Sequence, residues 1–183
     1  MTLRFPSPSL ALIPCLALAL LSGCSVMQSQ QGTEPVALNS QFAVIPLTNL
    51  SQTPQAGDQA ASILSALLRA KGANEVTLYL PEDDNPLVYD NRARQQQALA
   101  EALDNGADMV VSGTVNEWRY KNGLDGEPAV GITLEVRDPS DNGILWSGTA
   151  ARTGWGREGL SVAGHKVLQS LINAIPLQQG AGQ

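Results

Sequence analysis

Apolar and polar positions follow two different periods along residues 41–175, and each change of period marks a new element. Short apolar or alternating runs predict strands over 42–47, 76–80, 108–120, 130–137 and 144–150. Apolar residues spaced three and four apart predict helices from residue 58 to about residue 71, over 92–105 and over 159–174. The resulting order, β-α-β-α-β-β-β-α, predicts a single α/β domain in which helices pack against a mixed sheet.

Several single residues refine this prediction. Gly72 follows the first helix as a stop signal, and on the second helix Leu99 and Leu103 are expected to face the core. Gly113 is expected to mark a bulge in the long strand over 108–120. Asn142, followed by glycine, supplies the positive φ that a hairpin turn over 139–143 requires.

The two ends of the chain lack both periods. Residues 24–40 are polar, which predicts a flexible tether, and residues 176–183, rich in Gln and Gly, predict a disordered tail. Residues 1–23 contain Arg4 and then an apolar run over 10–21 that is too short to span a bilayer and is interrupted by Pro14. This pattern is typical of a signal peptide.

The signal peptide ends in Leu21-Ser22-Gly23-Cys24, which resembles the lipobox of bacterial lipoproteins. The resemblance implies cleavage before Cys24 and lipid on its thiol. The serine at the next position favours sorting to the outer membrane, on its periplasmic face. We therefore expect residues 24–40 to be a lipidated tether.

Cysteine content and charge limit the chemistry of the mature chain. Cys15 leaves with the signal peptide and Cys24 is acylated, so no thiol remains for a disulfide, a metal site or nucleophilic catalysis. Removing Arg4 from 11 basic and 17 acidic residues leaves a net charge of −7. An acidic chain disfavours nucleic acid and anionic headgroups and favours cationic partners, although acidity is also a common solubility device.

Catalytic candidates are few. His165 lies alone in the last predicted helix, where a surface position is the simpler interpretation. Asp83 and Asp84 could bind a hard cation but lie in a loop where solvated carboxylates are usual. Asp125 and Glu127 lie two residues apart on a turn. Nothing in that placement would raise the pKa of either carboxyl, as a glycosidase acid requires. We expect neither enzymatic activity nor a cofactor or metal.

Two segments combine charge, glycine and aromatic residues in a way that favours a binding role. The first, residues 117–128, joins two strands by a loop longer than a tight turn. The second, residues 152–158, places Trp155 between glycines, which favours an outward indole at a membrane or protein interface. The alternative is a Trp155 folded back over the sheet edge, whereas Trp118 and Trp146 lie in strand patterns typical of a core.

These segments resemble known periplasmic proteins. Residues 42–50, the helix from residue 58 and residues 107–115 are similar to the domain of CsgG, LpoB and the N-terminal part of TolB, which implies an anticodon-binding-domain-like fold. Residues 117–131, 144–148 and 151–161 resemble the PelC family, outer-membrane lipoproteins of Pel exopolysaccharide export in biofilms. The PelC resemblance covers most of the mature chain.

The PelC resemblance implies a homo-oligomeric ring, a dodecamer, beneath the outer membrane on the C-terminal barrel of the porin PelB. It implies that Asp125 and Glu127 belong to an acidic surface that guides the cationic polysaccharide, and that Trp155 faces the membrane. It assigns no role to Glu82, Asp83 or Asp84. A ring would repeat each carboxylate and so sum a field that salt would screen around one copy.

Two alternatives remain. An LpoB-like activator of a peptidoglycan synthase would need a long reach, but residues 25–40 span at most about 55 Å when fully extended. A CsgG-like channel would need amphipathic barrel strands from each subunit, and no such alternation is evident.

Overall fold

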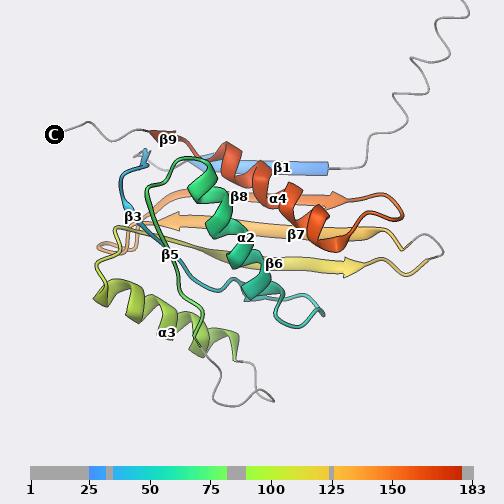
Figure 1. Cartoon of the computed structure of the whole chain (residues 1–183), viewed down its shortest axis with the longest axis horizontal. Coiled ribbons are helices and arrows are strands. Elements are labelled where there is room, and N and C mark those ends of the chain that lie inside the picture. The colour runs from blue at the N-terminus through green and yellow to red at the C-terminus, as the bar shows by residue number, and fades with distance from the viewer. Residues whose placement is uncertain (1–24, 32–34, 82–89, 124–125, 179–183) are drawn as a thin grey trace, which may run out of the picture.

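One mixed sheet organises the chain (Figure 1). The computed structural model describes residues 25–31, 35–81, 90–123 and 126–178. Seven strands form the sheet in the order β1-β8-β7-β6-β3-β5, with β4 beside β6. They are β1 (Ser25–Gln31), β3 (Gln41–Val44), β4 (Thr48–Asn49), β5 (Glu75–Leu78), β6 (Met109–Tyr120), β7 (Pro128–Arg137) and β8 (Ile144–Thr153).

The direction of each strand decides which segments of the chain share each end of the sheet. β3, β4 and β5 pair parallel to their neighbours, whereas β1, β8, β7 and β6 pair antiparallel to one another. The ends of β6 and β8 therefore lie beside the starts of β1 and β7. We call this end, formed by Ser25, residues 120–123, 126–128 and 153–160, the Trp155 end. The opposite end, with the turn over 138–143 and the starts of β3, β5 and β6, is the hairpin end.

Helices cover one face of the sheet fully and the other face in part. α2 (Ala56–Ala70) and α4 (Leu160–Ala174) pack on one face and build the main core. α3 (Asn91–Asp104) packs on the other face beside β3 and β6. Over β7 and β8 that second face stays open and polar, with Thr133 bonded to Thr149 at 3.2 Å. The fully buried side chains of the main core include Phe42, Leu64, Leu68, Ile132, Leu134, Leu168, Leu171 and Ile172.

Two tryptophans in the core each lie against a glycine. Trp118 and Trp146 are each 1% exposed, as predicted. A Cβ on Gly164 of α4 would lie 2.1 Å from Cη2 of Trp118, and a Cβ on Gly148 of β8 would lie 2.5 Å from Cη2 of Trp146. These glycines therefore set how closely α4 approaches β6 and how Trp146 lies on its own strand.

The predicted α/β class and the order of the long elements are confirmed. Asn142 has the predicted positive φ, 59°, and Gly72 ends α2 with φ 104°. The bulge lies between Val115 and Glu117, so its assignment to Gly113 was wrong. Gly113 is required for another reason, because a Cβ there would lie 2.0 Å from the Thr133 carbonyl oxygen.

The predicted inner face of α3 was also wrong. Leu99 and Leu103 are 36% and 45% exposed, and the buried residues are Arg94, Ala98 and Ala102. Small side chains let α3 approach the sheet closely, so the leucines on the adjoining stripe stay at the rim. Spacing by three and four could not choose between two stripes of one helix.

The flexible tether and disordered tail were wrong for the described residues at both ends. Ser25–Gln31 forms β1, which pairs with β8 along its length. β2 (Val36–Ala37) pairs parallel with β9 (Leu177–Gln178), and Val36 is fully buried. β1 is an edge strand held by backbone hydrogen bonds, with exposed side chains over residues 25–30, so no apolar period announces it. The predicted signal peptide, 1–23, lies outside the described residues.

Candidate functional site

Two loops lie side by side at the Trp155 end. The loop from β6 to β7 closes with Lys121 N–H donating to the Glu127 carbonyl at 2.7 Å. The loop from β8 to α4 joins it through Gly154 N–H, which donates to the Pro128 carbonyl at 2.8 Å. A Cβ on Gly154 would lie 2.7 Å from Pro128 Cγ, so only glycine allows this approach. Both segments that the sequence singled out thus meet at one place.

Trp155 is presented outward at this place, as predicted. It is 46% exposed, between two glycines. Its backbone N–H donates to Glu158 Oε2 at 3.3 Å, and its carbonyl accepts from Glu158 N–H at 2.9 Å. The loop is therefore folded around Glu158 and leaves the indole half in solvent.

Glu158 binds three partners from three elements. Its Oε1 accepts a hydrogen bond from Lys166 Nζ of α4 at 2.8 Å, and its Oε2 lies 3.5 Å from Arg152 Nη2 of β8. The hydrogen bond from Lys166 lowers the pKa of Glu158, burial opposes this, and the Trp155 N–H and Arg152 lower it further. We call Glu158, Arg152 and Lys166 the Glu158 clamp. Sequence reasoning missed it, because residues 152, 158 and 166 meet only once the fold is known.

The remaining predicted site residues lie partly inside and partly outside the described part of the chain. Glu127 is half-buried in the loop beside Trp155. Asp125 and Cys24 lie outside the described residues, as do Glu82, Asp83 and Asp84. Ser25, which follows Cys24, pairs with Arg152, so the chain leaves the described fold at the Trp155 end.

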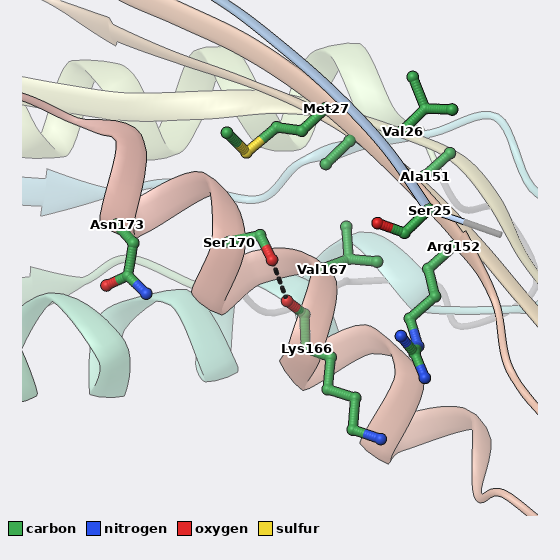
Figure 2. Close-up of a pocket in the computed structure, with 10 residues that line it drawn as sticks. Ser25, Val26, Met27, Ala151, Arg152, Lys166, Val167, Ser170 and Asn173 are labelled. Carbon is green, nitrogen blue, oxygen red and sulfur yellow. Dashed lines mark hydrogen bonds between the residues drawn. The ribbon is translucent and has the colours of Figure 1, made fainter. Parts of the chain in front are cut away.

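A shallow hollow of about 330 Å³ lies beside this point, between β1 and α4 (Figure 2). Met27, Ala150 and Val167 give it an apolar floor, and Arg152 and Lys166 of the clamp line it too. A second hollow, about 660 Å³, runs along α3 past Leu99 and Leu103. Neither lining contains a histidine, cysteine or carboxylate.

Other chemical groups do not gather at these places. His165 is exposed on α4. Within the described ranges, no three His, Cys, Asp or Glu side chains come close enough to hold a metal ion. In the same part of the chain, no helix has the length and apolar character needed to cross a membrane. The site that remains is the pair of loops at the Trp155 end.

Comparison with solved structures shows which family the chain belongs to. A PelC dodecamer from Paraburkholderia phytofirmans matches with a TM-score of 0.71 and 35% identity, over 85% of this chain and 100% of that one. The chain belongs to the PelC family. A second PelC dodecamer structure from the same organism, in space group C2, matches at 34% identity and a TM-score of 0.72 over the same shares.

More distant likeness supports the fold alone. Lipoprotein GNA1162 from Neisseria meningitidis is 18% identical, with a TM-score of 0.52, over 74% of this chain and 97% of that one. No protein-family model matches the chain. Membership of the PelC family therefore rests on the structures with about a third of their residues identical.

Proposed function

We propose that this chain is a non-enzymatic outer-membrane lipoprotein. It forms a ring on the periplasmic face of that membrane and guides a cationic exopolysaccharide, Pel, to its export porin, the barrel of PelB. One observation carries the proposal in a PelC-family chain: the residue after Cys24, the exposed Trp155 and the loop of Glu127 lie at the same end of the sheet.

The membrane placement is supported by where the chain leaves the fold. Ser25 is in register with Arg152, three residues before Trp155. Lipid on Cys24 would thus enter a bilayer close to a half-exposed indole, the side chain that best suits a membrane interface. The two features point the same end of the domain toward the membrane, and the axis of a ring would then run along the strands.

The ring is supported by the relatives. Both PelC structures described above are dodecamers. In such a ring Asp125 and Glu127 would recur once per subunit beside the membrane, so their field would add up where the polymer leaves. Binding of the polymer must be weak and spread over many sites, because tight binding would hold it in place.

The same geometry disfavours an LpoB-like activator. β1 begins at residue 25, immediately after the lipidated residue, and pairs with β8 along seven residues. The domain would therefore lie against the membrane. An activator that reaches across the periplasm needs a free tether at this position.

The charge mechanism is tested by Asp125→Lys in a strain that secretes the polymer. We expect secreted polysaccharide to fall several-fold at unchanged protein level, because a repeated cation would replace a repeated carboxylate. Glu101→Lys, an exposed residue of α3, makes the same charge change away from the Trp155 end and should leave secretion intact. Normal secretion from Asp125→Lys, or an equal loss in both variants, would contradict the mechanism.

A further inference from the structure

The Trp155 end carries more exposed apolar surface than Trp155 alone. Tyr120, the last residue of β6, is 49% exposed, and Val162, in the first turn of α4, is also 49% exposed. The Tyr120 hydroxyl accepts a hydrogen bond from Leu160 N–H at 2.9 Å, which holds the ring over the start of α4. Two half-exposed aromatic residues and a valine therefore lie around the place where the chain leads to Cys24.

Two exposed basic side chains at this end are available to bind an anion, although the whole chain is acidic. The side chains of Lys121 and Arg157 are exposed, and neither has an ion-pair or hydrogen-bond partner in the part of the chain that the structure describes. Arg152 and Lys166 share one carboxylate, Glu158. Within the ranges that define this end, Lys121 and Arg157 are matched in number by Glu127 and Glu158, but Glu158 is already bound by Arg152 and Lys166.

The hairpin end carries a surplus of carboxylates. Its described acidic residues are Glu75, Asp104, Asp108, Asp138 and Asp141, and they outnumber its basic residues, Arg69, Lys71 and Arg137. Charge is therefore separated along the strands, with the acidic side far from the residue after Cys24. A random scatter of surface charge that served solubility alone would not need this separation.

We propose that the Trp155 end is a docking surface for a bilayer that carries anionic phospholipid headgroups, with Tyr120, Trp155 and Val162 entering the interface and Lys121 and Arg157 facing the phosphates. This rests on the proposed membrane placement and adds the chemistry of the lipid. A bilayer is the occupant because lipid on Cys24 would be attached beside this surface. Aromatic and basic side chains together are typical of a membrane interface. The net acidity of the chain does not oppose this contact, since the surplus of carboxylates among the described residues lies at the hairpin end.

The test uses the mature chain, residues 24–183 with Cys24→Ser, so that binding is not dominated by lipid. Sedimentation with phosphatidylcholine vesicles is compared with sedimentation with vesicles that also contain phosphatidylglycerol. We expect clear preference for the anionic vesicles and loss of that preference in high salt. Lys121→Gln and Arg157→Gln should each weaken the binding of one subunit to anionic vesicles about five-fold. Lys71→Gln, at the hairpin end, is the matched control and should not.

Equal binding to both vesicle types, or an equal loss in Lys71→Gln, would overturn the headgroup inference. Trp155→Ser separates that failure from failure of the proposed function. If Trp155→Ser abolishes binding to both vesicle types while Lys121→Gln and Arg157→Gln leave binding unchanged, the membrane placement is supported and the preference for anionic headgroups is refuted. If the unsubstituted chain binds neither, the placement of Trp155 at the membrane falls as well.

Discussion

Replacing Glu158 by glutamine would test whether the Glu158 clamp holds the Trp155 loop. Glutamine keeps the shape of the side chain and removes its charge. Lys166 and Arg152 would then lose their shared carboxylate, and the Trp155 N–H would lose a charged acceptor. Arg152 is the more serious loss, because its side chain is 22% exposed and its Nε has no hydrogen-bond partner among the described residues even with the clamp intact.

The expected cost is about 2 kcal/mol of unfolding free energy. The Lys166 bond contributes about 0.5 kcal/mol, since that lysine is half in solvent. Leaving the guanidinium of Arg152 without its anion costs about 1–2 kcal/mol. For a domain of this size, a loss of about 2 kcal/mol lowers Tm by about 4–8 °C.

The pH dependence gives the prediction its sign. The pKa of Glu158 is lowered in the folded chain, chiefly by the hydrogen bond from Lys166. Its contribution is therefore fully present above the ordinary glutamate pKa, about 4.3, and is lost as pH falls through the lower folded value. The gap between the two proteins should be widest at about pH 7 and should close toward about pH 3.

Urea denaturation followed by tryptophan fluorescence measures this gap at both pH values. Glu101→Gln, an exposed glutamate on α3, is the matched control and should change the unfolding free energy by less than about 0.5 kcal/mol. A gap between the unsubstituted chain and Glu158→Gln that is absent at neutral pH, or that stays constant as pH falls, would refute the clamp.

Three further substitutions test the packing. Gly164→Ala should destabilise by about 1 kcal/mol in urea denaturation, because overpacking against Trp118 exceeds the gain in helix propensity; a more stable variant would contradict this. Asp58→Asn should cost about 3 kcal/mol by the same assay, because its 2.7 Å ion pair with Arg94 is largely buried, and a neutral result would show that the pair contributes nothing. Leu103→Gln should change stability by less than about 0.5 kcal/mol, because the leucine is exposed at the rim of α3. A loss of about 2 kcal/mol in calorimetry would show instead that Leu103 is a core residue.

The elements that the sequence predicted well are those whose side chains carry the signal. Trp118 and Trp146 lie in runs that the sequence predicts as strands, and both are core residues. Asn142 adopts the positive φ that its turn needs. In each case the local pattern and the tertiary structure require the same residue type.

The elements that it missed are held by backbone or by contacts distant in sequence. β1 has exposed side chains over residues 25–30, apolar Val26 and Met27 included, and pairs with β8 through main-chain groups, which any sequence could supply. α3 buries Ala98 and Ala102 where leucines on the next stripe looked more suitable. The ion pair of Glu158 with Lys166 could not be predicted, because it forms only when α4 packs against β8.

The site divides in the same way. Trp155 could be selected from its flanking glycines, and its exposure agrees with that interpretation. That Ser25 lies beside it could not be predicted, because the pairing of Ser25 with Arg152 joins residues far apart in the chain. The placement of Ser25 next to the Trp155 loop is a consequence of sheet topology alone.

The ring is the central claim, and the mass of the protein in solution tests it most directly. Light scattering would be applied to the lipidated protein in mild detergent and to residues 24–183 with Cys24→Ser, each across a range of concentration and salt. We expect one discrete large oligomer of the same subunit number in both samples, a dodecamer if this chain assembles as its relatives do. A monomer in both samples under all conditions would contradict the ring, and with it the summed acidic field that is proposed to guide the polymer.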